Sequence, residues 1–370
     1  MTSCPPDNLG LMPPQPYLKR VIEERVVLRR EQARELMRQL LTGGFTDVEL
    51  AALLGAITAR GENAAELAGF VDAMRAAAVP VPLDEEDRAA LVDTCGTGGD
   101  LSGTFNISTA AALVAAAATA NPGQRPVMVA KHGNRAVTST CGSADVLEAL
   151  GIPVTLSPDD AAGALRDKRF AFLHAPAMHP AMKAVMPVRR AIGVRTFFNV
   201  LGPLTNPAGA QRQVMGVYSA QLVPIVAEAM RLLNVGHAFV VHGFLDASRT
   251  AGMDELSISG PSQFAEVVGE HMFFAEVTPE MVGLKTAPIE ELRGGTAPDN
   301  AQMLRQIFAG ERGARRDVVL MNSAAVLLAA GLFPPMPWVE AFRAAIDLAA
   351  KTIDSGAVTK LIQQLAAREP

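Results

Sequence analysis

The sequence contains few cysteines and few aromatic residues. Among its 370 residues are three cysteines, one tryptophan and two tyrosines. Cys4, Cys95 and Cys141 form no CxxC pair and have no metal-ligand spacing, and an odd number of cysteines argues against a disulfide framework. We therefore expect a cytoplasmic protein.

The sequence also lacks an excess of positive charge and a long apolar run. Its net charge is −5 and its isoelectric point about 5.8, which argues against a broadly basic surface that would bind nucleic acid or anionic membranes. The longest apolar run, residues 110–118, is far shorter than the ~20 residues that span a bilayer. We expect neither a nucleic-acid nor a membrane partner.

What remains is the composition of a globular enzyme, with 49% hydrophobic and 19% charged residues and a length that suits about two domains. Residues 1–16 are rich in proline and carry no signal-peptide pattern, so we expect a flexible tail there. The sequence after this tail has helical periodicity. Thr46 with Glu49, and Asn63 with Glu66, have the spacing of an N-cap residue and an acid three positions later. We predict a small all-helical domain over residues 17–88.

From Leu91 onward, short β-like runs alternate with helical ones. The predicted strands are 91–95, 126–130, 170–173, 213–219 and 237–243, and the helices between them 109–120, 143–150, 157–167 and 222–233. This alternation predicts an α/β domain with a mostly parallel sheet over residues 89–370. A helical stretch at about 178–196 interrupts it and returns the chain to the helical domain, which would make that domain discontinuous.

The first glycine-rich loop, GTGGD at residues 96–100, follows the strand at 91–95. It fits neither GxGxxG, because position 101 is Leu101, nor the GxxxxGK[ST] pattern. A glycine turn that leads into a helix start at 106–109 presents free backbone amides, which suits a phosphorylated ligand. A tight connection between a strand and a helix would have the same pattern.

A second polar cluster follows the strand at 126–130. It places Lys131, His132, Asn134, Arg135 and Ser143 before another helix. Ligands gather at the carboxyl ends of parallel strands, so two such loops favour one shared anionic ligand. A solvated loop is the simpler interpretation of either cluster alone.

Two further groups of charged residues follow later strands or turns. Asp254 and Glu255 are adjacent hard-oxygen donors of the kind that bind Mg²⁺ together with substrate phosphates, although adjacent acids in isolation are usually solvated surface residues. Arg189, Arg190 and Arg195 could bind a carboxylate in a bidentate manner. We expect at least one of the three, Arg190, to be helix-surface charge.

Taken in order, these segments resemble the anthranilate phosphoribosyltransferase family of tryptophan biosynthesis. The resemblance runs from about residue 17 to residue 365 and rests on GTGGD, TFNIST, KHGNRA with GSADVLEALG, HPAMK, RTFFNVLGPLTNP and DELS. It implies a nucleoside phosphorylase/phosphoribosyltransferase-like fold, in which a small discontinuous helical domain joins a larger α/β domain. It also implies a homodimer formed through the helical domain.

The resemblance further implies the activity and the site. The family transfers phosphoribose from 5-phosphoribosyl diphosphate (PRPP) to the amine of anthranilate, with Mg²⁺, two ions per subunit, and releases diphosphate. The implied PRPP residues are Gly96, Gly99, Asp100, Thr104, Asn106, Ile107, Ser108, Thr109, Lys131, His132, Gly133, Asn134, Arg135, Ala136, Val137, Thr138, Ser139 and Ser143. The implied anthranilate residues are Gly96, Asn134, His179, Arg189 and Pro203, and the metal residues are Ser108, Asp254 and Glu255. His132 is the candidate for accepting the late proton, and no other general base is assigned.

Three positions depart from the family pattern, namely Leu101, Thr140 and a longer segment at 244–251. Two other functions remain open. One is a non-catalytic nucleic-acid-binding relative of the same fold, against which the acidic charge and the presence of Asn134 and Arg189 argue. The other is a pyrimidine nucleoside phosphorylase, which uses inorganic phosphate. The acid pair argues for a diphosphate substrate with a metal instead.

Overall fold

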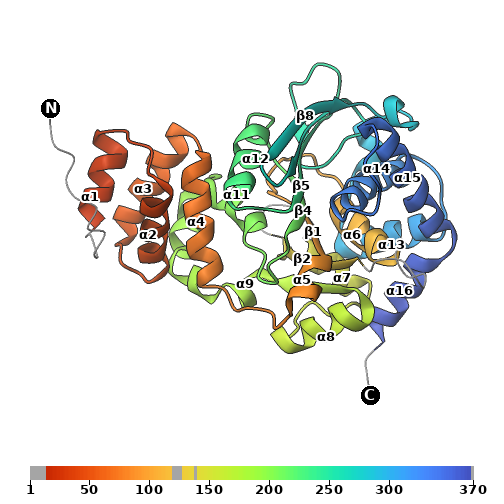
Figure 1. Cartoon of the computed structure of the whole chain (residues 1–370), viewed down its shortest axis with the longest axis horizontal. Coiled ribbons are helices and arrows are strands. Elements are labelled where there is room, and N and C mark those ends of the chain that lie inside the picture. The colour runs from red at the N-terminus through yellow and green to blue at the C-terminus, as the bar shows by residue number, and fades with distance from the viewer. Residues whose placement is uncertain (1–13, 119–126, 137–139, 368–370) are drawn as a thin grey trace.

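The computed structural model describes residues 14–118, 127–136 and 140–367. Figure 1 shows a helical body that contains the beginning of the described chain, beside a larger body built around a sheet. The tail predicted for residues 1–16 lies outside the described residues except for its last three, which belong to the first helix. Among the described residues, no helix is both long and apolar enough to cross a membrane.

The helical body is assembled from two separate parts of the chain. The first comprises α1 (Pro14–Leu18), the π-helix η1 (Lys19–Glu23), α2 (Arg30–Leu41), α3 (Asp47–Arg60) and α4 (Ala64–Ala76). The second comprises α9 (Ala175–Met178), the 3-10 helix η2 (Pro180–Ala184), α10 (Met186–Ile192) and α11 (Phe197–Leu204). Phe197 of α11 stacks on Phe70 of α4 with ring centroids 4.7 Å apart. The expectation of a discontinuous helical domain is therefore confirmed.

One of the two predicted helix caps is confirmed and the other is corrected. At the start of α3, Glu49 N donates to Thr46 Oγ1 at 3.3 Å and Thr46 N donates to Glu49 Oε2 at 2.9 Å. At the start of α4, Asn63 caps Ala65 N at 3.0 Å, but Glu66 turns inward instead. Its carboxylate accepts from Leu28 N at 2.8 Å and pairs with Arg60. The same spacing thus produced a surface cap in one helix and a buried ion pair in the next.

The sheet confirms the mostly parallel α/β architecture. Its strands lie in the order β3-β2-β1-β4-β5-β7-β8, and the pairs from β3 to β5 are all parallel. The strands are β1 (Leu91–Gly96), β2 (Met128–Gly133), β3 (Phe170–His174), β4 (Arg212–Gly216), β5 (His237–Phe244), β6 (Gly252–Met253), β7 (Ser262–Val268) and β8 (His271–Val277). Side chains alternate between the two faces of each strand, and helices cover both faces.

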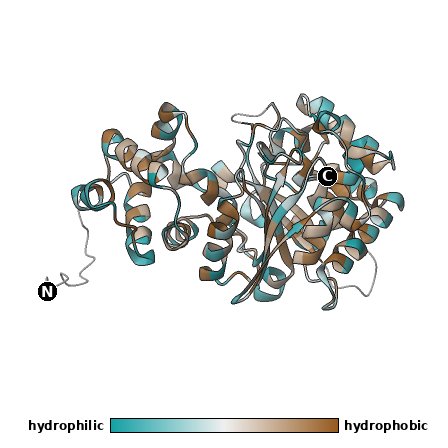
Figure 2. Cartoon of the chain, turned by 90° about the horizontal axis from the view of Figure 1, so that it is seen from above, coloured by the Kyte–Doolittle hydropathy of each residue, from teal (hydrophilic) through white to brown (hydrophobic). Residues whose placement is uncertain are grey.

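Helices of different origin cover the two faces. On one side lie α6 (Ile107–Ala118), α14 (Ala314–Ala329) and α15 (Trp338–Asp354), and on the other lie α8 (Pro158–Lys168), α11 and α12 (Leu222–Leu232). The remaining elements are α5 (Glu85–Ala90), α7 (Ser143–Ala149), α13 (Ala297–Phe308), α16 (Ala357–Ala366), η3 (Glu280–Val282) and η4 (Ile289–Leu292). Figure 2 shows that many of these helices carry a hydrophobic and a hydrophilic side. Because α12 also packs on α4, one apolar core joins the helical body to the sheet.

The structure corrects two strand boundaries and adds a hairpin. β2 extends to Gly133, so Lys131 and His132 are strand residues and not residues of the loop that follows. β4 ends at Gly216 instead of reaching Ser219. The antiparallel pair β7 and β8 was not predicted, although its two alternating runs are separated by only two residues, the first of which is Gly269 at φ +57°. Such spacing is a hairpin signal that was available in the sequence.

Glu66 provides a test of the helical core. We expect Glu66→Gln to lower the free energy of unfolding by about 2 kcal/mol, because a buried charge-assisted hydrogen bond to Arg60 is lost. Glu49→Gln is the matched control, since glutamine also completes an exposed capping box. Denaturant unfolding followed by circular dichroism measures both. Equal stability of the two variants would contradict the buried ion pair.

Candidate active site

The polar motifs meet at the carboxyl edge of the sheet. Gly96 ends β1 and is in register with Gly216, the last residue of β4, while Gly133 of β2 is in register with His174 of β3. The loops that leave these strands therefore begin at neighbouring points. This arrangement brings the glycine loop, the end of β2 and the Asp254 segment into one region, as expected for an open α/β sheet.

The glycine loop turns through left-handed backbone conformations. Gly98, Gly99 and Gly103 have φ of +69°, +73° and +67°, and Leu101 adopts +63°. A left-handed conformation costs a side-chain-bearing residue about 1 kcal/mol, and the Leu101 side chain is 87% exposed. The loop is closed by two backbone hydrogen bonds, one from Phe105 N to Leu292 O at the end of η4 at 3.1 Å and one from Gly294 N, just after η4, to Gly103 O at 2.9 Å.

The acid pair lies directly against this loop. Asp254 Oδ2 accepts from Gly98 N at 2.6 Å, and Glu255 Oε1 accepts from Ser108 N at the start of α6 at 3.0 Å. The fit depends on glycine at the two strand ends. A Cβ atom at Gly96 would lie 2.1 Å from Asp254 Oδ2, and one at Gly216 would lie 1.6 Å from Asp254 O. Any larger residue would displace the acid.

The charge distribution around these acids suits a divalent cation. Burial, followed by the charges of Asp100 and Glu255, raises the pKa of Asp254 well above its usual value. Burial also raises the pKa of Glu255 to about 7, against the lowering effect of Lys131. Among the described residues, no cluster of three or more acidic, cysteine or histidine side chains forms a complete metal cage. The adjacent carboxylates of Asp254 and Glu255 fit Mg²⁺, which uses one or two carboxylates together with substrate phosphates.

Lys131 is a buried cation among the strand ends. Its side chain is 1% exposed, and Nζ donates to Thr94 O at 2.6 Å and to Ser108 Oγ at 3.3 Å. The cation therefore lies between β1, β2 and the start of α6, on the side of the glycine loop.

His132, the next residue, serves the opposite side. Its Nδ1 lies 3.2 Å from Gly202 O, and a carbonyl accepts only, so Nδ1 carries the proton and Nε2 has a free lone pair. Nε2 is buried without a partner among the described residues, as is Nε2 of His179, whose ring centroid lies 5.1 Å away. Burial, with a smaller effect of His179, lowers the pKa of His132 to about 3, so the ring is neutral.

Arg189 lies on the same side as His179, in α10. Its guanidinium packs 4.9 Å from the Phe198 ring centroid, and among the described residues no carboxylate forms a salt bridge with it. Burial lowers its pKa to about 10. A half-buried arginine without an anionic partner is suited to binding a carboxylate from a ligand. Its neighbour Arg190 is exposed, as predicted.

Other predicted site residues have a different environment from the one expected. Arg135 is not a free cation, because it forms hydrogen bonds with Glu148 at 2.6 Å and with Asp145 at 3.2 Å. Ile107 and Thr109 are each 1% exposed, so their side chains face the core and only their backbone can reach a ligand. Arg195 binds Gly99 O at 2.8 Å and lies 4.5 Å from the ring centroid of Tyr218, so it supports the glycine loop.

The remaining predicted residues occupy the loops around these groups. Asp100 binds Ser102 Oγ at 2.7 Å, Thr104 lies 3.3 Å from the same oxygen, and Ser143 Oγ donates to Asn134 O at 3.2 Å. Asn106 Oδ1 accepts from Asn300 at 2.9 Å, Ala136 N donates to Asp145 at 2.9 Å, and Pro203 is buried in α11. Val137, Thr138 and Ser139 lie outside the described residues.

Asp93 and Asn206 also belong to this region, although neither was predicted. An acidic residue inside an apolar strand was a visible signal for Asp93.

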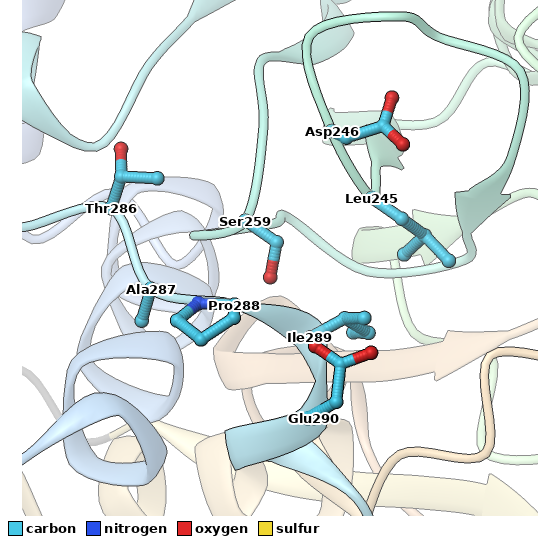
Figure 3. A pocket seen from close by; sticks show the side chains of 8 residues that line it. All are labelled: Leu245, Asp246, Ser259, Thr286, Ala287, Pro288, Ile289 and Glu290. Carbon is cyan, nitrogen blue, oxygen red and sulfur yellow. The ribbon is translucent and has the colours of Figure 1, made fainter.

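The departures from the family pattern affect the edge of the site. In the segment 244–251, Phe244 ends β5 and residues 245–251 form the loop to β6. The two strands pair at Gly243 with Met253, so the chain leads directly into Asp254. A pocket of about 470 Å³ lies beside this loop, and Figure 3 shows the side chains that surround it. It is lined by Leu245, Asp246, Ser259, Thr286, Ala287, Pro288, Ile289 and Glu290. None of these is a predicted site residue. Thr140 is exposed at the edge of the second loop.

Comparison with known proteins agrees with this arrangement. Residues 15–78 match the helical bundle domain of a glycosyl transferase family and residues 88–359 match the a/b domain of that family. The chain is 46% identical to an anthranilate phosphoribosyltransferase of Symbiobacterium thermophilum, with 94% of this chain and 96% of that protein covered. It is 45% identical to the enzyme of the same name from Brevibacillus brevis, over 91% and 93% of the two chains.

Solved structures give the same result. The crystal structure of anthranilate phosphoribosyltransferase from Thermus thermophilus has a TM-score of 0.82 at 41% identity and covers 95% of this chain and 98% of that one. The Saccharomyces cerevisiae enzyme in complex with PRPP and Mg has a TM-score of 0.81 at 25% identity, with 95% and 96% covered. The chain belongs to the anthranilate phosphoribosyltransferase family.

Proposed function

We propose that this protein transfers the 5-phosphoribosyl group of PRPP to the amine of anthranilate in tryptophan biosynthesis, giving N-(5-phosphoribosyl)anthranilate and diphosphate. The observation that carries the proposal is that two adjacent side chains at the end of β2 contact different groups. Lys131 reaches Thr94 of β1 and Ser108 at the start of α6, whereas the adjacent His132 faces Gly202 and His179. Two different ligands therefore have places on either side of one strand end.

On the donor side, the chemistry depends on charge neutralisation. The bond from ribose C1 to diphosphate weakens as negative charge builds up on the leaving group, and donors already in place stabilise that charge without reorganising. The glycine loop, the start of α6 and Lys131 supply such donors. Asp254, Glu255 and Ser108 would hold Mg²⁺, two ions per subunit, and bound Mg²⁺ would neutralise diphosphate.

On the acceptor side, the residues orient a weakly basic amine. Arg189 would bind the anthranilate carboxylate, while Gly96, Asn134, His179 and Pro203 surround the ring. An aryl amine is already neutral at pH 7, so placement behind C1 matters more than deprotonation. The lone pair on His132 Nε2 accepts a hydrogen bond from this amine. With a pKa of about 3, it is too weak a base to remove a proton before the new bond forms.

The two alternative functions receive less support. A nucleic-acid-binding relative would need a basic surface, but the net charge is −5 and Arg135 is paired with acids. A pyrimidine nucleoside phosphorylase would not need the acid pair beside the glycine loop. The relatives named above are anthranilate phosphoribosyltransferases, and this chain aligns with nearly their whole length.

We further propose the division into a helical domain, residues 17–88 with 178–196, and an α/β domain, residues 89–370, and a homodimer formed through the former. In the described part of the helical domain, four large apolar side chains are exposed, namely Ile22 at 44%, Val27 at 43%, Val48 at 79% and Val194 at 64%. Cytoplasmic location stays a prediction. Light scattering should give the mass of a dimer, and a mass near 38.9 kDa would contradict dimer formation.

The activity itself is tested by mixing the protein with PRPP, Mg²⁺ and anthranilate and following the loss of anthranilate fluorescence. Arg189→Ala should raise the KM for anthranilate roughly 10- to 100-fold, because a charge-assisted bond to a carboxylate is removed, and should leave the KM for PRPP unchanged. Arg190→Ala is the matched control, because Arg190 is the exposed neighbour. Equal losses for both substrates would place Arg189 outside the acceptor site.

Asp254→Asn tests the metal site. We expect turnover to fall and the Mg²⁺ concentration for half-maximal rate to rise at least about tenfold, because a charged ligand is lost. Asp246→Asn, a change of the same kind in an exposed loop residue, should leave both unchanged. An unaltered Mg²⁺ profile in Asp254→Asn would remove this acid from the metal site.

A further inference from the structure

Asp93 is a charged residue in the middle of a buried strand and has no part in the transfer described above. It is 0% exposed. Its two oxygens accept from different segments, Oδ2 from Asn206 Nδ2 at 2.8 Å and Oδ1 from His132 N at 3.2 Å. Burying an ionised carboxylate costs free energy of desolvation unless the group is paired, and an apolar residue at position 93 would avoid this cost.

Asn206 completes the connection. It is 5% exposed, and its Nδ2 also donates to Ala130 O at 2.7 Å, while its Oδ1 accepts from Ala208 N at 2.9 Å. Both amide hydrogens and the amide oxygen are therefore used. Asn206 lies just after α11, in the turn that also contains Thr205, whose Oγ1 donates to Gly202 O at 2.9 Å.

The bridge between Asp93 and Asn206 joins the two substrate sides. Asp93 is in β1, three residues before Gly96 and the glycine loop. Its partner His132 N is in β2, between Lys131 on the donor side and the His132 ring on the acceptor side. Asn206 holds the end of α11, and Gly202 O within that helix fixes the ring. The bridge thus sets the position of the acceptor-side turn against the strands that carry the donor side.

The electrostatic environment agrees with a role in holding these groups together. Burial raises the pKa of Asp93 to about 6, while the charge of Lys131 and the hydrogen bonds from Asn206 and His132 N lower it. Cys95 Sγ lies 3.7 Å from Oδ2.

We propose that Asp93 and Asn206 are positioning residues that align the acceptor amine with ribose C1 of the donor. This inference rests on the proposed function. The bridge touches neither substrate directly, so each substrate can bind alone when it is altered. Productive alignment of two bound reactants is more sensitive, because a shift of about 1 Å can cost on the order of 100-fold in rate. The effect should therefore appear in kcat.

The test uses Asp93→Asn and Asn206→Ser in the full-length protein. In Asp93→Asn, the new side-chain NH2 group faces either Asn206 Nδ2 or His132 N. Both of these are donors, so one of the two hydrogen bonds is lost. In Asn206→Ser the charge of Asp93 is kept, but the serine side chain is shorter than the asparagine side chain that bridges Asp93 and β2. We expect kcat to fall roughly 10- to 100-fold in both, with each KM within about threefold of wild type. Calorimetric titration with PRPP and Mg²⁺ should give unchanged binding.

Glu66→Gln is the matched control. Like Asp93, Glu66 is a buried carboxylate that accepts from one backbone N–H and one side chain, but it lies in the helical domain. We expect it to lower the midpoint of thermal unfolding without changing kcat. A general loss of stability would lower kcat in all three variants alike and would contradict the proposed role.

The outcomes separate the two proposals. Folded Asp93→Asn and Asn206→Ser proteins with wild-type kcat, or with a loss confined to one KM, would overturn the positioning role while leaving the proposed function intact. Failure of both to fold would also overturn it, since the bridge would then serve folding. Absence of turnover in the wild-type protein would overturn the proposed function and this inference with it.

Discussion

The organisation of this protein depends on how closely the chain approaches the carboxyl ends of β1 and β4. Gly96 and Gly216 lie side by side in register, and neither leaves room for a Cβ atom next to Asp254. The carboxylate of Asp254 is thereby held against the amide of Gly98 in the glycine loop. Acids and amides that would otherwise be solvated separately become parts of one site. A side chain at either strand end would separate them.

A second constraint is the apolar core shared between the two domains. Helix α12 packs both on the sheet and on α4, and Arg30 Nη1 of α2 donates to Leu232 O at the end of α12 at 2.6 Å. Arg75 Nε of α4 donates to Leu204 O at 3.0 Å, at the end of α11. Arginine–carbonyl contacts and buried side chains together hold the acceptor-side helices at a defined place beside the strands. The relative placement of Arg189 and the glycine loop follows from this packing.

The site combines charges that oppose one another. Asp93, Asp254 and Glu255 are carboxylates whose pKa values are raised by burial, and Lys131 is the cation that faces two of them. In such an environment each hydrogen bond and each charge has more effect than it would in water. This explains why the region contains so many backbone amides directed at carboxylates. It also gives a reason for holding the neutral His132 on the far side of the same strand, away from the excess of negative charge.

The sequence by itself determined the order of the elements, the parallel character of the sheet and the motifs that mark the site. These features are local, because strand and helix periodicity, glycine turns and adjacent acids are properties of neighbouring residues. Tertiary structure decided how polar residues with similar patterns are used. Glu49 and Glu66 share a spacing, yet only Glu66 is buried, because Leu28 N and Arg60 lie beside it. Arg135 and Arg189 are both cations next to motifs, yet within the described ranges only Arg135 forms salt bridges with acids. Such partners come from distant parts of the chain, so no local pattern could specify them.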